Sequence, residues 1–567
     1  MQPARVSRAG FSLGAPAQSV EGALFIFQSA DLAYDAAMNL RAAVASKLPA
    51  RLILFAMLGT LCACSTLRTD FVKTPSAAIV PVADTSSTRY VQAEIAAHPG
   101  QSGFRLLVSN QNALMSRIVL TDRARHSIDL QYYIFANDAT GRLLAQRLLA
   151  AADRGVRVRV LLDDLDIVKE DALLDALDAH PNIEVRLFNP FRFRQRSILS
   201  KIGQFLLEGV RLNRRMHNKS FIVDGMQAII GGRNIGDAYF DVGDDVHFRD
   251  LDTLAIGTVV PEIAASFDAY WNSDVAFPVR AFSGANATSK DLATARAQLG
   301  RDARTFSESD YAQALEYELP NGPSADQRGG WFWGGARLVA DVPEKVDPDE
   351  DRRTAHIDHQ VRLVLDAARQ QALLVSPYFI PGDDGAKVLE TLAGRGVDIK
   401  VLTNSLAATD EPAVHAGYAR YRPRLLRAGV ELYEFRPIGG RNTQNALGRS
   451  SGVSLHAKAM VIDHHQVFIG SMNFDPRSRY LNTEMGVVAD SPALAAAVEQ
   501  FFAHAAVPQN SFHVVLEPAR GALSSRAMLW IATDDGKTVQ YDHDPDVSTW
   551  KRVQVDLMRF LPIEGLL

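Results

Sequence analysis

Cysteine, an excess of basic charge and long apolar segments are all scarce in this sequence of 567 residues. Its only cysteines are Cys62 and Cys64, so no disulfide framework can hold the rest of the chain, and its stability must come from packing. The formal net charge is -5, whereas a dedicated nucleic-acid-binding protein usually has an excess of Lys and Arg. We therefore expect no nucleic acid among its partners. The composition, 47% hydrophobic and 22% charged, indicates an ordinary globular body.

The one long apolar run, residues 52–61, follows basic residues and is too short for the ~20 residues that a membrane-spanning helix needs. This pattern is typical of a secretion signal. Counted from Met38, the signal would cover residues 38–63, within the usual length of roughly 15 to 30 residues. We therefore predict that residues 1–37 lie upstream of the true start.

The end of this run, Leu61-Cys62-Ala63-Cys64, resembles the lipobox of bacterial lipoproteins. The resemblance implies that Cys64 is the lipidated first residue of the mature chain, which would be anchored in the bacterial cell envelope and face the periplasm. Whether the inner or the outer membrane holds it stays open. The alternative is an ordinary signal peptide with an incidental cysteine.

The rest of the chain divides into five segments. Residues 64–104 are rich in Thr, Ser, Ala and Pro without a sustained period, which predicts a tether. Two α/β halves are expected over residues 105–275 and 353–505, separated by an irregular insertion over residues 276–352. Residues 506–567 are expected to form a hairpin and a terminal helix, with one helix face made by Val553, Leu557, Phe560 and Leu561.

Each half begins with the same order of elements. Strands are predicted over residues 127–135 and 156–163, with a helix over residues 141–152 between them. The second half repeats this order with strands over residues 372–380 and 397–404 and a helix over residues 385–394. A strand, a helix and a further strand predict a right-handed parallel crossover. Because the landmarks recur in one order at nearly one offset, we infer a duplicated α/β unit.

The strongest signal is a motif that occurs twice. His217 and Lys219 are followed by Asp224, and at the same spacing His456 and Lys458 are followed by Asp463. Each copy continues to an asparagine, Asn234 or Asn473, that lies 17 residues beyond its histidine. One copy alone would be weak evidence, but two copies with the same downstream residues indicate a duplicated site.

Each motif is expected to form a β-hairpin that gathers its polar side chains. With a two-residue turn at Asp224-Gly225, Asn234 would lie diagonally across from His217. The same register places Ser471 across from His456, with Asn473 on the diagonal. The candidate phosphate ligands are therefore Lys219, Lys458, Asn234, Asn473 and Ser471.

Two histidines suit a double displacement at a phosphodiester, in which one attacks phosphorus and the other protonates the departing alkoxide. Both halves should therefore meet at one shared site. Asp224 and Asp463 belong to the motif but sit at the turns, so we expect them to hold the hairpins. Asp252 and Glu484 begin matched runs and are the better candidates for carboxylates that orient the imidazoles.

No group of His, Asp or Glu shows recognisable metal-ligand spacing in the sequence, so we expect neither a metal nor another cofactor.

These motifs resemble those of the phospholipase D superfamily. The resemblance extends to bacterial cardiolipin synthases of the C type over five stretches: Arg211 to Lys219, Gly231 to Phe240, His415 to Arg420, Ser471 to Arg477 and Leu481 to Gly486. It implies two α/β halves, each a mixed sheet flanked by helices, joined face to face with pseudo-twofold symmetry. It also implies a phosphohistidine intermediate, with His217 as nucleophile and His456 as general acid, although symmetry allows the exchange.

The resemblance further implies transfer of a phosphatidyl group from one phospholipid to phosphatidylglycerol, with phosphatidylethanolamine as a further candidate substrate. An accessory protein is left open. The same site would serve a phospholipase D-type hydrolase or, with less support, a nuclease. A non-catalytic envelope scaffold is the remaining alternative, disfavoured because both motifs are intact. The basic amphipathic segment 192–215 is a candidate for contact with a membrane surface, or else packs on the protein.

Overall fold

The structure, a computed structural model, describes residues 73–82, 84–164, 171–191, 208–243, 247–282, 287–313, 330–347, 356–437, 452–517 and 527–559. Every structural statement below refers to these residues. Cys64, the signal segment and most of the basic segment 192–215 lie outside them.

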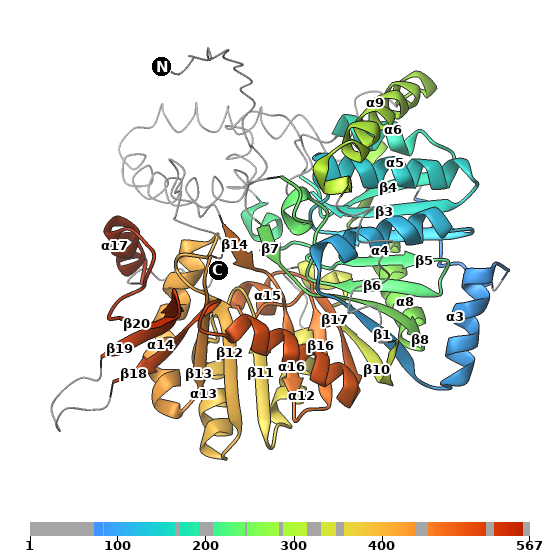
Figure 1. Cartoon of the computed structure of the whole chain (residues 1–567). Coiled ribbons are helices and arrows are strands. Elements are labelled where there is room, and N and C mark those ends of the chain that lie inside the picture. The colour runs from blue at the N-terminus through green and yellow to red at the C-terminus, as the bar shows by residue number, and fades with distance from the viewer. Residues whose placement is uncertain are drawn as a thin grey trace, which may run out of the picture. The chain divides into compact units, whose positions relative to one another are not determined.

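The first half, coloured blue to green in Figure 1, alternates strands and helices as the sequence predicts. Polar caps start its first helices, since Ser109 and Asp138 each accept a backbone N–H bond from the first turn that follows. Its strands are β1 (Ser102–Leu107), β2 (Ser127–Tyr132), β3 (Arg157–Asp163), β4 (Ile183–Phe188), β5 (Ser220–Val223), β6 (Gln227–Gly231), β7 (His247–Arg249), β8 (Asp252–Gly257) and β9 (Ala276–Pro278). Its helices are α4 (Asn110–Arg123), α5 (Ala139–Asp153), α6 (Asp171–Asp178) and α8 (Val259–Asn272), with a short 3-10 helix, η2 (Asp237–Tyr239).

The second half, coloured yellow to red, repeats this order. Its strands are β11 (Gln371–Val375), β12 (Asp398–Asn404), β13 (Glu431–Phe435), β14 (Val453–Leu455), β15 (Ala459–Ile462), β16 (Gln466–Gly470) and β17 (Met485–Asp490). Its helices are α12 (Ile357–Asp366), α13 (Gly382–Gly394), α14 (Pro412–Ala428), α15 (Pro476–Tyr480) and α16 (Pro492–Ala506).

Both halves contain a mixed sheet of the same topology. In the first, the strand order is β9-β4-β3-β2-β5-β6-β8-β1, with β2, β3 and β4 parallel and the others antiparallel. The second half has the order β13-β12-β11-β15-β16-β17, again with a parallel set, β11 to β13. The parallel pairs β2–β3 and β11–β12 are those predicted for the two crossovers.

One strand, β10 (Phe332–Ala340), joins the two sheets. Its first residues pair with β1 and the remainder pair with β17, so the two sheets are continuous. Together with three C-terminal strands described below, they form one sheet of 18 strands in the described residues. Gly334 permits the crossing, because a Cβ there would lie 2.1 Å from the carbonyl oxygen of Asp490. The expectation of an irregular insertion over residues 276–352 is therefore wrong for β9, β10 and the helix α9 (Ser289–Ser307), which packs against α5.

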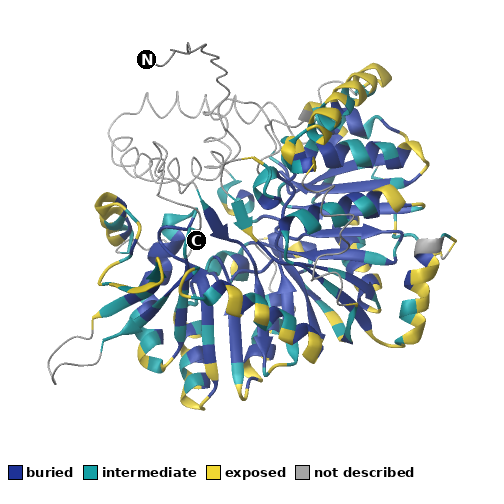
Figure 2. Cartoon of the chain, in the orientation of Figure 1, coloured by how far each residue is buried: buried dark blue, intermediate teal, exposed yellow. Residues whose placement is uncertain are grey.

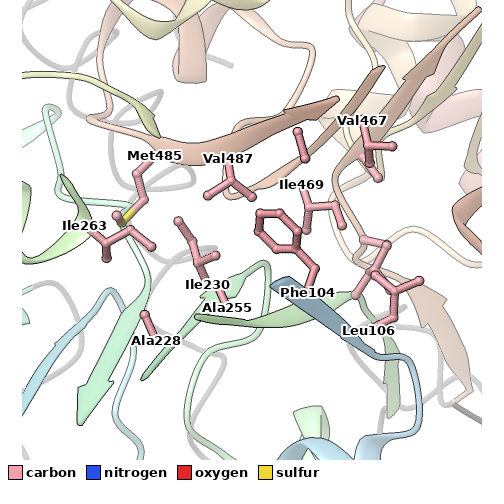
Figure 3. Packing of buried hydrophobic residues seen from close by; sticks show 14 of the residues in the cluster. Phe104, Leu106, Ala228, Ile230, Ala255, Ile263, Val467, Ile469, Met485 and Val487 are labelled. Carbon is pink, nitrogen blue, oxygen red and sulfur yellow. The ribbon is translucent and has the colours of Figure 1, made fainter. Parts of the chain in front are cut away.

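The two halves share a buried hydrophobic cluster. Figure 3 shows Ala228, Ile230 and Ala255 of the first half close to Ile469, Met485 and Val487 of the second. Each fully buried aliphatic side chain contributes roughly 1.5–3 kcal/mol, so the halves stabilise each other. The expected face-to-face joining is confirmed. Figure 2 shows the consequence, with buried strands inside and the exposed residues mainly on the outer faces of the helices.

The predicted tether over residues 64–104 is wrong from residue 73 onward. The backbone N–H of Ala78 donates to Asp268 of α8 at 2.7 Å, and α3 (Ser86–Ala97) begins at a capping box on Thr85. Val91 of α3 is buried against Met226 and Ile256. This part of the chain therefore belongs to the first half.

The C-terminal segment adds a hairpin and a helix to the second half. After β18 (Ser511–Leu516), β19 (Met528–Asp534) and β20 (Lys537–Tyr541) form the expected hairpin with a turn at Asp535-Gly536, and α17 (Thr549–Met558) follows. Of the expected apolar face, Val553 and Leu557 are 43% and 63% exposed while Val555 is buried instead, and Phe560 and Leu561 lie outside the described residues. No helix in the described part of the chain is long and apolar enough to span a membrane.

Candidate active site

Short parallel pairings between the halves position the two histidines. Strand β7 pairs with β14, and the backbone N–H of His456 donates to the Arg249 carbonyl at 2.7 Å. On the other side Met216 pairs with Thr483, and the N–H of His217 donates to the Thr483 carbonyl at 2.9 Å. Each histidine therefore follows a segment that is bonded to the opposite half, so the site exists only when both halves are assembled.

The end of a central strand also fixes each histidine-bearing segment. The carboxylate of Asp163, at the end of β3, accepts a bond from the Met216 N–H at 2.8 Å. In the second half, Asn404 at the end of β12 bonds both the N–H and the carbonyl of Leu455 at 2.9 Å. These buried bonds fix the backbone directly before each histidine.

Each imidazole is held by a carboxylate from the other half. The Nδ1 atom of His217 lies 2.8 Å from Oε2 of Glu484, and Nδ1 of His456 lies 2.5 Å from Oδ2 of Asp250. A carboxylate at Nδ1 keeps the proton on that nitrogen, which leaves the lone pair on Nε2. The Nε2 atoms are thus the nitrogens available to attack phosphorus or to exchange a proton with a substrate oxygen.

Of the two carboxylates expected to orient an imidazole, the structure places Glu484 at one and does not place Asp252 at the other. The Asp252 carboxylate binds Arg117 at 2.8 Å and accepts the backbone N–H of Arg233 at 3.2 Å, both within the first half. The prediction for Asp252 is therefore wrong, and the residue in that place is Asp250.

The two-residue error comes from the sequence alignment of the halves. Gly231 pairs with Asp252 in the first sheet, whereas the equivalent Gly470 pairs with Gly486 in the second. Asp252 thus corresponds to Gly486, and Asp250, which sequence reasoning missed, corresponds to Glu484. Counting two residues back from the residue that pairs with each glycine identifies Asp250 and Glu484.

The two motif lysines are buried next to their histidines. The ammonium of Lys219 donates to the His217 carbonyl at 2.6 Å, and that of Lys458 lies 2.9 Å from Nδ1 of His456 and also donates to the His456 carbonyl. Burial lowers the pKa of Lys219 to about 7; the charge of Lys458 also lowers this pKa, and Glu484 raises it. Burial likewise lowers the pKa of Lys458 to about 8, against the raising effect of Asp250. An anionic ligand would restore the charge of both ammonium groups.

Burial also keeps both imidazoles neutral near neutral pH. It lowers the pKa of His217 to about 4, outweighing the raising effect of Glu484. It lowers the pKa of His456 to about 3, with Lys458 acting in the same direction and Asp250 opposing. A neutral imidazole with a free Nε2 is the nucleophilic form, so the resting site is prepared for attack.

The motif hairpins have a register one residue away from the expected one. Val223 pairs with Gln227 and Ile462 pairs with Gln466, so each loop has three residues and not two. Each loop begins with an aspartate at positive φ, Asp224 or Asp463. The extra residue shifts every cross-strand neighbour by one, and the histidines lie beyond the end of the paired strands.

The two motif aspartates hold backbone, as expected for the hairpins. The Asp224 carboxylate accepts the N–H groups of Arg125, His126 and Ser127, which lead into β2. The Asp463 carboxylate accepts the corresponding three N–H groups of residues 369–371, which lead into β11. Each hairpin is therefore fixed to the central strand beside it.

The expected phosphate ligands have different surroundings. The Asn234 amide donates to the Tyr239 hydroxyl at 2.8 Å. Asn473 is buried and its Oδ1 has no hydrogen-bond partner among the described residues, so this amide can turn toward a ligand. Ser471 departs from the expectation, because its hydroxyl donates to Glu484 at 2.5 Å and so supports the carboxylate that holds His217.

Aromatic rings surround the imidazoles unequally. Tyr133 of the first half lies edge-on to His217 at 5.1 Å between centroids. His456 contacts two rings of the first half, Tyr239 at 5.2 Å and Phe248 at 5.0 Å. The two histidines thus have similar polar partners but different walls, which gives a physical basis for different roles. In the described ranges, no three His, Cys, Asp or Glu side chains are grouped so as to hold a metal ion.

Comparison with known proteins agrees with the geometry. Residues 118–271 and 361–506 match a family model described as cardiolipin synthase, PLD-like domain. The chain is 40% identical to cardiolipin synthase C of Escherichia coli (strain K12) over 474 residues, which cover 83% of this chain and 97% of that protein. It is 28% identical to cardiolipin synthase 2 of Bacillus anthracis, with 71% of this chain and 64% of that protein covered.

A solved structure shows the same fold. The chain is similar to the crystal structure of the phosphatidylserine synthase of Haemophilus influenzae Rd KW20, with a TM-score of 0.51 and 12% identity, covering 85% of this chain and 100% of that one. At this identity the similarity supports the fold alone, a duplicated α/β unit with mixed sheets.

Proposed function

The chain belongs to the family of cardiolipin synthases with a phospholipase D-like domain, and we propose that it transfers a phosphatidyl group from a donor phospholipid to a headgroup hydroxyl of phosphatidylglycerol. The similarity to cardiolipin synthase C over nearly the whole of that protein carries the proposal. The two carboxylate-held histidines supply chemistry that suits it.

We assign the first step to attack by His217. Its Nε2 bonds to phosphorus while the bond from phosphorus to the donor headgroup oxygen breaks, which forms a phosphohistidine. His456, protonated when the anionic substrate is bound, gives its Nε2 proton to the departing alkoxide. Lys219, Lys458 and Asn473 bind the non-bridging oxygens as negative charge grows on them.

The second step reverses these roles. His456, now neutral, takes the proton of the acceptor hydroxyl, whose oxygen attacks phosphorus as the bond to His217 breaks. Glu484 and Asp250 stabilise the imidazolium that each step creates. With phosphatidylglycerol as acceptor the product is cardiolipin, and with water it is phosphatidic acid.

The acceptor therefore decides between the transferase and a hydrolase that uses the same site. Purified protein should be given vesicles of phosphatidylglycerol, with and without phosphatidylethanolamine, and the lipid products should be separated. We expect cardiolipin together with the free headgroup of the donor. Phosphatidic acid without cardiolipin, for every donor mixture, would overturn the transferase. A chelator should leave the rate unchanged, whereas loss of activity that zinc restores would contradict a metal-free site.

The membrane anchor is a separate part of the proposal, supported by the lipobox-like sequence before Cys64. Mass spectrometry of the mature N-terminus should find a diacylglyceryl group on Cys64 in the bacterial envelope. An unmodified cysteine there would exclude the anchor.

We also propose that α17 touches the membrane surface. Trp550, Val553 and Leu557 lie three and four residues apart on this helix and are 67%, 43% and 63% exposed. Tryptophan and aliphatic side chains on one helix face favour the boundary of a bilayer. Replacing Trp550 and Leu557 by Ser should reduce flotation of a Cys64→Ser protein with anionic vesicles. Leu363→Ser, which removes a similarly exposed residue from α12, should not.

A further inference from the structure

The α14 segment from His415 to Arg422 seats the C-terminal helix α17 on the second half. Nε2 of His415 lies 3.2 Å from Asp544, and Arg422 donates to the same carboxylate at 2.9 Å. Arg420 donates to the carbonyl of Arg559, at the other end of α17. Between these points Val555 is buried against Leu406 and Ala416. The segment before α17, the middle of the helix and the residue that follows it are therefore all held by α14 or its neighbours. Figure 1 shows α17 at the end of the chain, in dark red.

One residue of α17, Lys551, is only 7% exposed. It occupies the first turn of α17, where its backbone N–H is capped by Ser548. Among the described residues its ammonium group makes no hydrogen bond or ion pair, and the charge that acts on it is that of Asp410. Both burial without a partner and a position near a helix N-terminus disfavour a cation. An anionic ligand at this ammonium would offset both effects.

Asp410 connects Lys551 to the catalytic residues. Its carboxylate accepts a hydrogen bond from the Tyr378 hydroxyl at 2.8 Å, and both side chains are partly exposed. The charges of Lys458 and Lys551 both act on the Asp410 carboxylate. A lysine of the catalytic motif and a lysine of the C-terminal helix thus influence one carboxylate, which also binds a phenol.

We propose that Lys551, Asp410 and Tyr378 bind the headgroup of the acceptor lipid, a glycerol that already carries a phosphate. The proposal rests on the proposed function, since only a transferase that joins two phospholipids must hold two phosphates at once. Lys219 and Lys458 serve the phosphate being transferred, and Lys551 serves the phosphate of the acceptor. The Asp410 carboxylate and the Tyr378 oxygen accept hydrogen bonds from the glycerol hydroxyls, so that one hydroxyl is presented to the phosphohistidine.

The test compares an acceptor glycerol that carries a phosphatidyl group with free glycerol, which has neither the second phosphate nor its lipid chains; soluble glycerol phosphate, used as an inhibitor, isolates the phosphate. Lys551→Met protein is assayed with one donor lipid and either phosphatidylglycerol or free glycerol as acceptor. We expect the KM for phosphatidylglycerol to rise about tenfold or more, because a charged contact is lost, while transfer to glycerol is unchanged. The thermal midpoint should stay the same or rise, since Met removes an ammonium that has no bonding partner among the described residues. Arg552→Gln, which removes a cation from the same helix, should leave both acceptors unaffected.

The outcomes separate this proposal from the proposed function. If the wild-type protein formed no cardiolipin, both the proposed transferase function and the acceptor site would be excluded. Wild-type protein that forms cardiolipin, with an unchanged KM for phosphatidylglycerol in Lys551→Met, would overturn the acceptor site alone. An equal loss with glycerol and phosphatidylglycerol would assign Lys551 to the structure of the site and also overturn it. Soluble glycerol phosphate should inhibit the wild-type protein and not Lys551→Met. This result would show that recognition depends on the headgroup chemistry and not on the bilayer.

Discussion

The Nδ1 atom of His456 lies 2.5 Å from a carboxylate oxygen of Asp250, a residue 206 positions earlier in the chain and in the other half of the molecule. Glu484 holds His217 in the same way from the opposite direction. Each half therefore supplies the carboxylate that holds the histidine of the other half, in addition to sharing a hydrophobic core with it. An isolated half would have a histidine without the group that sets its tautomer, which explains why the duplicated unit acts as one enzyme.

We predict that Asp250→Asn lowers turnover by about 10²–10⁴-fold with little change in stability. The amide keeps the shape of the side chain but cannot stabilise the imidazolium of His456. The measurements are the rate of cardiolipin formation and the thermal midpoint. Near-normal turnover would show that His456 does not depend on this carboxylate.

Asp252→Asn is the matched comparison, two residues away and equally buried. It weakens the bonds to the buried Arg117 and Arg233, which are partners within the fold and not of a histidine. Breaking such a pair costs about 3–5 kcal/mol, so this variant should unfold more easily. Its folded fraction should keep more activity than Asp250→Asn. The reverse ranking would restore the assignment of Asp252 to the imidazole.

Gly232→Ala should inactivate the enzyme by moving Asp250. A Cβ at Gly232 would lie 2.2 Å from Oδ1 of Asp250, closer than any stable contact, so the carboxylate must move away from His456. Since the equivalent position in the second half is Ser471, the protein tolerates a side chain there only beside the longer Glu484. We expect a loss of kcat comparable to that of Asp250→Asn, measured on folded protein.

Gly335→Ala is the control for this substitution. Gly335 lies on β10, and a Cβ there would meet no atom within 4 Å. Its turnover should match the wild type. If both alanine variants behaved alike, the close approach at Gly232 would not matter for catalysis.

The sequence predicts the local pattern of the fold better than the connection between its parts. The crossovers, such as β2 to β3, follow from strand and helix periods that are encoded within some 40 residues. The role of β10 was missed because Trp331-Phe332-Trp333 and the adjacent glycines do not alternate like a strand. Its two partners, β1 and β17, are distant in sequence, and only the packed halves bring them to the same strand.

The site shows the same division. The histidines and lysines are recognisable because duplication repeats their spacing, and Glu484 stands at the start of a matched run. Asp250 lies outside the matched run chosen for the first half, and a shift of two residues preserves the inward or outward direction of a strand side chain. The alternation of side chains therefore cannot distinguish Asp250 from Asp252. The cross-strand partners of Gly231 and Gly470 in the two sheets do distinguish them.

The assignment of His217 as nucleophile predicts where a trapped intermediate forms. His217→Ala and His456→Ala should each lose about 10³-fold or more in turnover. With a donor labelled in its phosphatidyl group, His456→Ala should still accumulate some label on His217, because the base that activates the acceptor is missing. Peptide mapping at neutral pH locates the label. Label on His456 in the His217→Ala protein would exchange the two roles, and near-normal rates in either variant would exclude a shared site.

The pH dependence of kcat/KM should report the lowered pKa values of the site. Below the range set by His217, with its pKa near 4, protonation removes the nucleophile, so the rate should fall only at distinctly acid pH. Above the pKa of Lys219, about 7, and that of Lys458, about 8, the free enzyme loses the positive charge that binds the phosphodiester. His456, with its pKa lowered to about 3, must also take up the proton for the leaving group when substrate binds, which becomes harder as the pH rises, so the rate should fall again. The optimum should therefore lie on the acid side of neutrality. Assays in uncharged detergent micelles avoid the pH shift at an anionic vesicle surface.

Replacing Glu484 by Gln removes the negative charge that raises the pKa of His217, so the acid limb of the pH profile should move to still lower pH while the maximum rate drops. An acid limb that stays near pH 6.5 in both proteins, the ordinary range of histidine, would show that burial does not control this imidazole.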